Sequence, residues 1–434
     1  MPTSLSEEAR ARGIRYFLIS YVDLFGALRA KLVPASAIDG MARSGAGFAG
    51  FASWLDLTPA DPDVSAIPDP ASLIQLPWKK EVGWLAADPW IRGAPLAHAP
   101  RNVLKSVIAK ATEQGLALKT GVECEFFLLT PDGQNIGDGA DTAEKPCYDQ
   151  SALMRRYDVI AEICDCMQEL GWNPYQNDHE DGNGQFEMNW EFDHALVTAD
   201  RQAFFKYMVK AIAEKHGLRA TFMPKPFLDR TGTGCHTHAS LWRGETNVCE
   251  DPADPLGLSP LGYQVVAGLL DRAEEICAIT NPTVNSYKRI NAPVTLSGAT
   301  WSPNTVSYAG DNRTHMIRVP GGGRLELRLA DGAANPYLLP AVLLVAALDG
   351  IAGARHPGPP LDLNMYAEAH KAPAGLRRLP LNLLDALRRL DGSAVMRAGL
   401  GAAFVDSYVK LKMGEWNDYA HHLTEWERAN TLDC

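Results

Sequence analysis

The sequence predicts an α+β protein with a small N-terminal domain, residues 1–100, and a large second domain, residues 101–434. Residues 34–100 are rich in Gly and Pro and contain few helical stretches, which is typical of short strands joined by turns. Beyond Pro100, amphipathic helical stretches alternate with short strand patterns. A chain of 434 residues is long enough for both parts to bury a core.

The individual elements follow from the hydrophobic periodicity. Residues 14–33 alternate around Asp23–Gly26 as a β-hairpin does. The apolar run Tyr337–Leu348 contains Pro340 and is too short to span a bilayer, so it predicts a buried helix. Helices are predicted over 102–116, 151–171, 200–217, 259–279 and from 336 onward, and strands over 118–129, 184–193, 219–224, 235–243, 314–319 and 323–329.

Charge and cysteine usage limit the class of protein. A net charge of −11 argues against nucleic acid or an anionic membrane as the main partner, although local cations can still bind an anionic substrate. The eight cysteines include no CxxC pair, which favours a reduced, intracellular protein. Cys164 and Cys166 lie in a predicted helix, where side chains two positions apart diverge, so buried thiols are expected rather than a metal site. The N-terminus lacks the apolar core of a signal peptide, and we predict a cytoplasmic protein.

Acidic residues, histidines and arginines recur in short segments that have the pattern of strands and contain or adjoin glycines. In GVECEFF (121–127), two glutamates sit two residues apart and therefore share one face of a strand. One such pair is usually a solvated face, but several together favour a site for Mg²⁺ or Mn²⁺ and for an anionic ligand. No P-loop or Rossmann fingerprint is present, so any nucleotide must be held by metals and arginines. The groups are Glu123 with Glu125, Glu180 with Glu187, His236 with His238, and Arg324, Glu326 and Arg328.

These segments, in this order, resemble the glutamine synthetase family. The resemblance covers most of the chain and implies a β-grasp-like N-terminal domain followed by a catalytic domain whose antiparallel sheet is flanked by helices. It also implies a homododecamer of two stacked hexameric rings with active sites between subunits. The family joins an amine to glutamate by way of γ-glutamyl phosphate, at the expense of ATP. The matching segments are DLFGALRAK (23–31), PDP (68–70), GVECEFF, HEDGNGQFE (179–187), ATFMPKPF (220–227), GTGCHTHASLW (232–242), NPTVNSYKR (281–289), NRTHMIRVP (312–320) and RLELRLADGAANPYL (324–338).

Roles carry over by position in these motifs. The resemblance implies two or more divalent cations, Mg²⁺ or Mn²⁺, with one held near glutamate and one at the ATP phosphates. The cation near glutamate would be held by Glu125, Glu180 and Glu187, and that at the phosphates by Glu123, His236 and Glu326. Glutamate or its acyl phosphate would be positioned by Gly232, Arg289, Arg313 and Arg328, and ATP by Phe192, His238, Ser240, Arg318 and Arg324. For Phe192, adenine stacking and core packing are equally acceptable interpretations.

At two places the sequence departs from the family pattern, and in the family both places serve to bind or deprotonate the amine substrate. In FAGFAS (48–53), Ala49 stands where the family's ammonium-binding Asp is expected, and Ala52 where a serine is. In KRINAPV (288–294), the loop is shorter and Asn291 replaces an acid before Ala-Pro. An amide cannot act as a base. An apolar lining leaves bare ammonium without compensation for its lost hydration, whereas an alkyl group gains about 0.8 kcal/mol for each buried CH₂.

The sequence therefore favours an ATP-dependent ligase for glutamate and a small alkylamine, methylamine first, similar to the γ-glutamylmethylamide synthetase branch of the family. The alternatives are a divergent ammonia-dependent glutamine synthetase and a γ-glutamylpolyamine synthetase. An inactive structural relative would be expected to have lost metal ligands, and this chain keeps all six. Glu180 and Asp56 are the candidates for deprotonating the amine. Tyr366 lies near the position adenylylated in some relatives, but it is interpreted as an exposed structural tyrosine.

Overall fold

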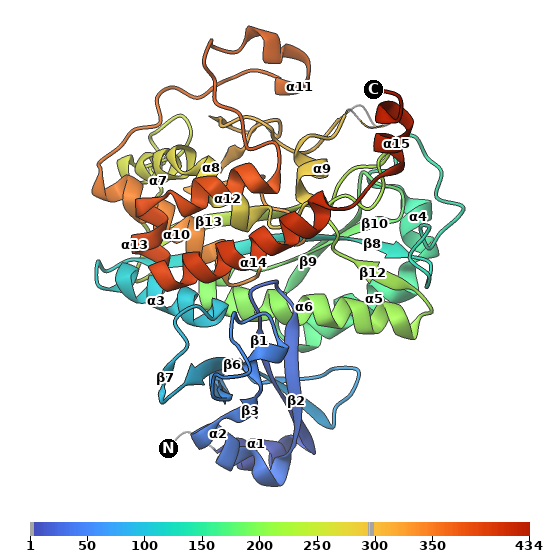
Figure 1. Cartoon of the computed structure of the whole chain (residues 1–434), viewed down its shortest axis with the longest axis vertical. Coiled ribbons are helices and arrows are strands. Elements are labelled where there is room, and N and C mark those ends of the chain that lie inside the picture. Colours follow the sequence, from blue (N-terminus) through green and yellow to red (C-terminus); the bar gives the residue numbers. More distant parts are fainter. Residues whose placement is uncertain (1–3, 294, 296–298) are drawn as a thin grey trace.

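The computed structural model describes residues 4–293, 295 and 299–434. It contains a seven-stranded and a ten-stranded sheet with flanking helices, and the α+β fold class is confirmed. The first sheet lies at one end of the molecule with α1 and α2, and the second sheet and most helices form the rest (Figure 1). The strands are β1 (Tyr16–Val22), β2 (Leu28–Pro34), β3 (Ala46–Phe48), β4 (Val64–Pro68), β5 (Ile74–Gln75), β6 (Val82–Ile91), β7 (Ala94–Pro95), β8 (Ala117–Leu129), β9 (Pro174–His179), β10 (Gln185–Trp190), β11 (Asp193–His194), β12 (Arg219–Thr221), β13 (Cys235–Arg243), β14 (Thr246–Asn247), β15 (Tyr308–Ala309), β16 (Ile317–Gly321) and β17 (Arg324–Leu327). The α-helices are α1 (Leu5–Arg12), α2 (Ile38–Ser44), α3 (Pro100–Thr112), α4 (Gln150–Arg155), α5 (Tyr157–Glu169), α6 (Ala195–Lys215), α7 (Pro260–Asp271), α8 (Ala273–Thr280), α9 (Ser286–Ile290), α10 (Leu338–Ala352), α11 (Met365–Glu368), α12 (Leu383–Asp391), α13 (Ala394–Leu400), α14 (Ala402–Ala420) and α15 (Glu425–Thr431).

The first sheet has the strand order β2-β1-β6-β4-β3. Strands β1 and β2 form the hairpin that the sequence predicts, with Tyr16 opposite Pro34 and Val22 opposite Leu28, and β1 runs parallel to β6. One face of this sheet has its own small core around Phe17. Side chains such as Trp84 instead join the large core of the molecule, so the two sheets share packing.

The second sheet has the order β15-β16-β17-β13-β8-β10-β9. Its central strand β8 spans 13 residues and pairs with β13 and β10 on its two sides. Helix α10 contacts α3 and α7, and its residues Leu338–Ala347 are all buried, as the apolar run predicts. A core on both sides of β8 fixes its register, because a slip of one residue would turn every side chain to the opposite face.

Two predicted helices are broken in the structure. The stretch 151–171 divides into α4 and α5 at Arg156, and the stretch 259–279 divides into α7 and α8 at Arg272. At both arginines ψ is near zero, at 14° and 7°, so the regular helix is interrupted. Both side chains are tied elsewhere, Arg156 to the carbonyl of Gly137 and Arg272 to Asp349. Hydrophobic periodicity carries no signal for such a break, because the apolar face continues through it.

A buried arginine ties the first sheet to the helical layer. Arg101 of α3 donates to Asp200 at 3.0 Å, Asp88 at 2.6 Å and Asp69 at 2.8 Å. Asp69 follows β4 and Asp88 lies in β6, whereas Asp200 belongs to α6. The guanidinium can satisfy several carboxylates at once because it presents a planar fork of donors. This junction therefore sets the position of the first sheet relative to α6.

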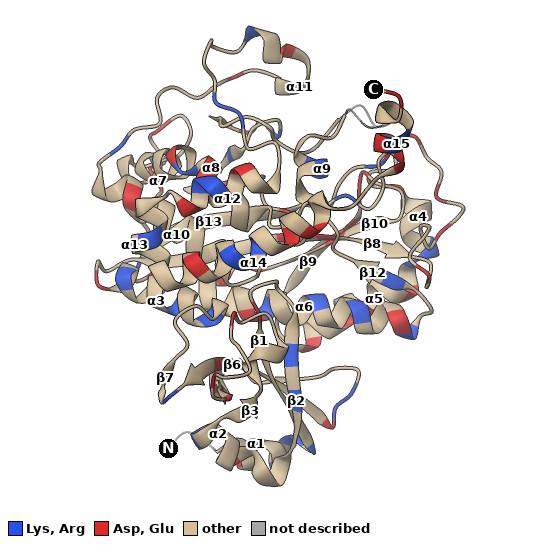
Figure 2. Ribbon diagram, viewed as in Figure 1, with Lys and Arg blue, Asp and Glu red and all other residues tan. Residues whose placement is uncertain are grey.

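Charges of both signs are mixed along the outer helices α12 and α14 (Figure 2). All eight cysteines are free thiols, with Cys166 buried and Cys164 partly buried in α5. Of the described helices, none is both long and apolar enough to cross a membrane.

Candidate active site

The register of the second sheet gathers the predicted acids and histidines on neighbouring strands. Glu123 of β8 lies opposite His236 of β13, and Glu125 lies opposite Glu187 of β10. Glu326 of β17 lies opposite His238 on the other side of β13. Directly opposed residues in antiparallel strands have Cβ atoms about 4.5–5.5 Å apart. The i, i+2 spacing in the sequence therefore becomes a contiguous cluster across four strands.

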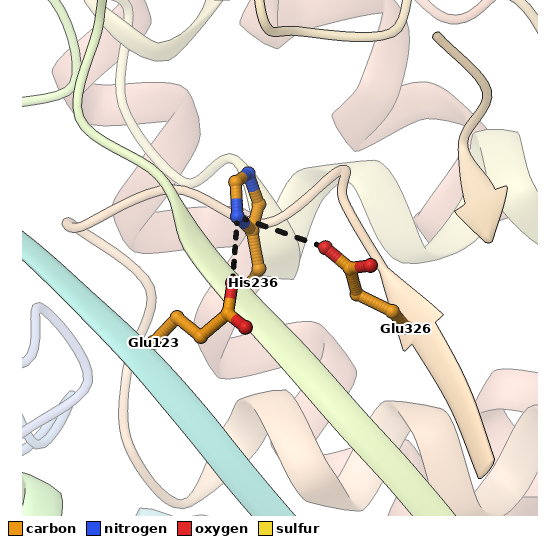
Figure 3. Close-up of side chains that lie close together, drawn as sticks. All are labelled: Glu123, His236 and Glu326. Carbon is orange, nitrogen blue, oxygen red and sulfur yellow. Dashed lines mark hydrogen bonds and ion pairs between the residues drawn. The ribbon is translucent and has the colours of Figure 1, made fainter. Parts of the chain in front are cut away.

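The first cluster is formed by Glu123, His236 and Glu326, whose side chains converge from three strands (Figure 3). The Nδ1 atom of His236 lies 3.1 Å from Oε2 of Glu123 and 3.8 Å from Oε1 of Glu326. Potential ligand atoms of all three residues lie within 4.8 Å of one another. His238 contacts the other oxygen of Glu123 at 2.8 Å and orients that carboxylate.

A second, more acidic group adjoins the first. Ligand atoms of Glu125, Glu187 and His236 lie within 4.8 Å of one another, as do those of Asp178, Glu180 and Glu187. Glu180 is thus brought to Glu187, as predicted, whereas Asp178 is an acid that the sequence interpretation missed. Its signal was present, because Asp178 precedes Glu180 by two positions and lies opposite Glu187 across β9 and β10. Because the sequence of β9 is polar, hydrophobic periodicity did not predict this strand.

The protonation behaviour of these acids fits a site built for cations. Burial, together with the charges of Glu180, Glu123 and Glu125, raises the pKa of Glu187 well above its ordinary value. Burial and the charge of Glu125 raise the pKa of Glu180 to about 8. Like charges this close disfavour ionisation of each other, and a divalent cation removes that penalty. The donor set of carboxylates and one imidazole fits Mg²⁺ or Mn²⁺.

Glu123 and Glu326 behave differently because cationic partners surround them. Burial alone raises the pKa of Glu123, but the hydrogen bonds of His236 and His238 lower it overall. Glu326 is fully buried and accepts from Arg318 at 2.6 Å and from Arg328. Burial opposes ionisation of Glu326, yet the charges of Arg328 and His236 lower its pKa. These neighbours therefore favour the ionised form of both carboxylates in the first cluster.

Two further arginines remain available to a ligand. Arg313 and Arg324 are exposed and line the acidic pocket, a cavity of about 280 Å³. Within the part of the chain that the structure describes, neither side chain makes an ion pair. Unpaired cations next to carboxylates are suited to a phosphate group, which the guanidinium fork can bind in bidentate fashion.

A less polar cavity of about 380 Å³ adjoins the acidic pocket and shares Glu123, His238 and Arg324 with it. Phe192 lines this cavity, is 54% exposed and lies 6.2 Å from the ring of Trp242. The interpretation of Phe192 as a core residue is therefore wrong. Ser240 also lines the cavity, and its hydroxyl accepts from the indole N–H of Trp242 at 2.9 Å.

Gly232 and Arg289 form a closely packed wall behind the acids. A Cβ atom at Gly232 would lie 2.7 Å from the carbonyl oxygen of Pro224 and 2.8 Å from Cγ of Arg289, so a side chain would displace the arginine. Arg289 is buried and donates to the carbonyl of Leu329 at 2.9 Å. Burial lowers the pKa of Arg289, while Asp331 and Glu125 nearby favour its charge. Neither Gly232 nor Arg289 is among the residues that line the acidic pocket, so the structure places this predicted pair behind the pocket wall.

The sequence departs from the family pattern at residues expected to bind the amine. Within one chain, the structure places these residues away from both pockets. Ala49 is exposed in the loop after β3, and Asp56 accepts from Lys410 of α14 at 2.7 Å. Asn291 is exposed, and its side chain donates to the carbonyls of Tyr287 and Leu381. Val294, the end of that loop motif, lies outside the described residues.

Tyr366 also differs from its sequence interpretation. It is half-buried rather than exposed, and its hydroxyl lies near the guanidinium groups of Arg328 and Arg289. The reason is tertiary, because Tyr366 lies beside Thr300 and Trp301, which are distant in the sequence and leave no local pattern.

Comparison with known proteins agrees with this geometry. A family model described as "Glutamine synthetase, catalytic domain" matches residues 97–431. A glutamine synthetase of Rhizobium meliloti is 60% identical over the full length of both chains. A glutamate–methylamine ligase of Methyloversatilis universalis is 40% identical, covering 100% of this chain and 99% of the relative. The solved structure of a GmaS/ADP complex superposes with a TM-score of 0.96 at 62% identity over both full chains.

The acid and histidine clusters, the adjoining cavities and these full-length matches point the same way. The chain belongs to the glutamine synthetase family.

Proposed function

We propose that the chain is an ATP-dependent ligase that forms a γ-glutamyl amide from L-glutamate and a small alkylamine, with methylamine as the preferred acceptor. The reaction proceeds through γ-glutamyl phosphate and releases ADP and phosphate. The observation that carries the acceptor assignment is Asn291, because an amide with no basic atom stands where an acid is expected, and its side chain donates to the carbonyls of Tyr287 and Leu381. The full-length likeness to a glutamate–methylamine ligase supports it.

Two divalent cations, Mg²⁺ or Mn²⁺, fit the acid clusters. We assign one to Glu123, His236 and Glu326. We assign the other to Glu125, Glu180 and Glu187, with Asp178 adjoining it. When bound, such cations neutralise phosphate oxygens and polarise the group being transferred.

The side chains around the clusters position the substrates. Arg313 and Arg324 are the unpaired cations, so they bind phosphoryl oxygens of ATP, together with Arg318. Phe192 stacks on the adenine in the less polar cavity, beside His238 and Ser240. We assign glutamate to Arg328, which lines the acidic pocket, with Gly232 and Arg289 packed behind it.

Amide formation also requires a proton acceptor, because an alkylammonium has a pKa close to that of lysine, about 10.4. Glu180 is the candidate within the pocket. Asp56 is the second candidate and would come from a neighbouring subunit, because in its own chain it pairs with Lys410. Glu180→Gln and Asp56→Asn should slow amide formation more than acyl-phosphate formation. If both variants form the amide as fast as the wild type does, neither residue is the base.

An ammonia-dependent glutamine synthetase is the second candidate, because relatives 60–61% identical to this chain carry that name. A polyamine ligase is a third. The deciding experiment measures phosphate release with ATP, glutamate and a series of amines, and compares kcat/KM for methylamine, ammonium and a diamine. We expect methylamine to give the highest value. A higher kcat/KM for ammonium would overturn the acceptor assignment and leave the ligase assignment intact.

The assembly follows from the same proposal. We infer a homododecamer of two hexameric rings in which the loop carrying Ala49 completes the amine site of a neighbouring subunit. Mass measurement in solution tests the subunit number. Cytoplasmic location stays a prediction.

A further inference from the structure

Trp301 occupies an unusual place beside the glutamate end of the acidic pocket. Its side chain lines the pocket with Arg328 and Thr231. Its backbone has a φ of 51°, in the left-handed region that a bulky L-residue rarely adopts. Strain of this kind persists only where surrounding structure imposes it, and it is often found at ligand sites.

The indole nitrogen of Trp301 is shielded from solvent and has no hydrogen-bond acceptor among the described residues. The N–H group of an indole can only donate. Buried donors are nearly always satisfied, so this one calls for an acceptor that is not part of the described chain. Arg328 lines the same pocket, so the ligand that suits this indole carries anionic oxygens.

Tyr366 lies against the same loop from the other side. Its phenol lies beside the Thr300 side chain and the backbone N–H of Trp301. The Thr300 hydroxyl itself donates to the carbonyl of Ser302 at 3.2 Å. The guanidinium groups of Arg328 and Arg289 are close to the same phenol. Tyr366 therefore lies close both to the strained backbone of Trp301 and to the two arginines that we assign to glutamate.

The segment before Tyr366 is itself firmly held. The carbonyl of Leu363 accepts from Asn312 at 3.0 Å, Thr314 at 3.3 Å and His315 at 3.0 Å. The hydroxyl of Thr314 in turn accepts from the backbone N–H of Met365 at 3.1 Å. A tyrosine at the start of α11 therefore stands on a fixed support, as a positioning residue requires.

We propose that Trp301 binds the glutamate substrate by donating its indole N–H to a carboxylate oxygen, and that Tyr366 is a positioning residue that holds Trp301 in place. This inference rests on the proposed function only in taking L-glutamate as a substrate. It does not depend on the amine, because glutamate is common to the methylamine and ammonium reactions.

The test is kinetic and uses the full-length enzyme with whichever amine the wild type accepts. Trp301→Phe keeps an aromatic ring and removes the donor, and Tyr366→Phe removes only the hydroxyl. A hydrogen bond to a charged group corresponds to roughly a 10-fold change in affinity, so we expect KM for glutamate to rise about 10-fold in Trp301→Phe. KM for ATP and for the amine should stay within twofold of the wild type.

Tyr366→Phe should raise KM for glutamate less, and the double variant should be no worse than Trp301→Phe alone, because Tyr366 acts through Trp301. Trp416→Phe, the same change on α14 outside the pockets, is the matched control. Thermal melting of each variant shows whether it is folded. Glutamate should also change the tryptophan fluorescence of the wild type, and this change should shrink in Trp301→Phe.

The outcomes separate the two proposals. An unchanged KM for glutamate in a folded, active Trp301→Phe enzyme overturns the inference, as does a rise confined to KM for the amine. Wild-type enzyme that releases no phosphate in the presence of glutamate and any amine instead overturns the proposed function.

Discussion

Glu187 of β10 and Glu125 of β8 face each other as a directly opposed pair of carboxylates in the interior of the sheet. Opposed like charges destabilise a sheet, and burial increases the cost. A divalent cation would compensate such a pair, and the proposed metal site would supply that cation.

The first prediction follows from this pair. Glu187→Gln removes one of the two facing charges and keeps the shape. We expect the metal-free variant to melt a few degrees higher than the metal-free wild type, because it loses the cost of holding the Glu187 carboxyl group beside Glu125, whether that cost is repulsion or protonation at a raised pKa. Mg²⁺ or Mn²⁺ should raise the melting temperature of the wild type much more than that of the variant. Glu113→Gln, at an exposed position after α3, is the control and should leave both values unchanged.

Glu326 supports a second prediction, because it compensates two arginines at once. Glu326→Ala would leave Arg318 and Arg328 without their shared carboxylate. Removal of one partner from a buried ion pair costs roughly 3–5 kcal/mol, so the variant should unfold at clearly lower denaturant concentration. Ligase activity should fall at least ~100-fold, which phosphate release measures. Wild-type activity in a folded Glu326→Ala protein would contradict the metal assignment.

Strand periodicity predicted this part of the site well. Two-residue spacing alone placed Glu123 with Glu125 and His236 with His238 on shared faces, and the sheet register then gathered them. The spacing could not give strand order, which is why Asp178 was missed: it joins the cluster only through its neighbour β10.

Other features depended on tertiary contacts that leave no local pattern. Tyr366 is half-buried because it lies beside Thr300 and Trp301, more than 60 positions earlier in the sequence. The breaks at Arg156 and Arg272 interrupt helices whose apolar faces continue. Phe192 could be core or surface on sequence alone, because an aromatic side chain suits both.

The third prediction concerns the nucleotide. Phe192→Ala should raise KM for ATP about 10-fold, since stacking of a base on an aromatic ring contributes roughly 1–3 kcal/mol. Phe192→Tyr should restore most of the affinity. Tyr157, which is 55% exposed on α5 compared with 54% for Phe192, offers a matched control. Equal effects of Phe192→Ala and Tyr157→Ala on KM for ATP would argue against stacking.

The fourth prediction is a pH dependence of stability. Burial lowers the pKa of His315, whose Nδ1 contacts the Ser307 hydroxyl at 2.9 Å and whose Nε2 contacts the carbonyl of Leu363. A ring that bonds a carbonyl through one nitrogen and a hydroxyl through the other is satisfied in its neutral form.

The sign follows from linkage. The folded-state pKa of His315 lies below the ordinary value of about 6.5, so the unfolded chain binds more protons near that pH. The stabilising contribution is complete above pH ~6.5 and is lost as the pH falls through the lowered folded-state pKa. The hydrogen bond to the Leu363 carbonyl and the charge of Asp362 oppose this shift only partly. Denaturant unfolding between pH 7.5 and 5.5 should therefore show a smaller loss of stability in His315→Gln than in the wild type.

The last prediction concerns the choice of amine. Ala49 is exposed, and its φ of −71° and ψ of 94° are extended values that Asp adopts without strain. If this loop completes a neighbour's amine site, Ala49→Asp supplies the carboxylate that bare ammonium lacks. A charge-assisted hydrogen bond of this kind should shift the ratio of kcat/KM for ammonium to that for methylamine by roughly 10-fold toward ammonium. Ala60→Asp adds the same charge at another exposed position and should leave the ratio unchanged. Because the effect requires a second subunit, dilution that dissociates the assembly should abolish activity in both variants, and an Ala49→Asp enzyme with an unaltered ratio would remove this loop from the amine site.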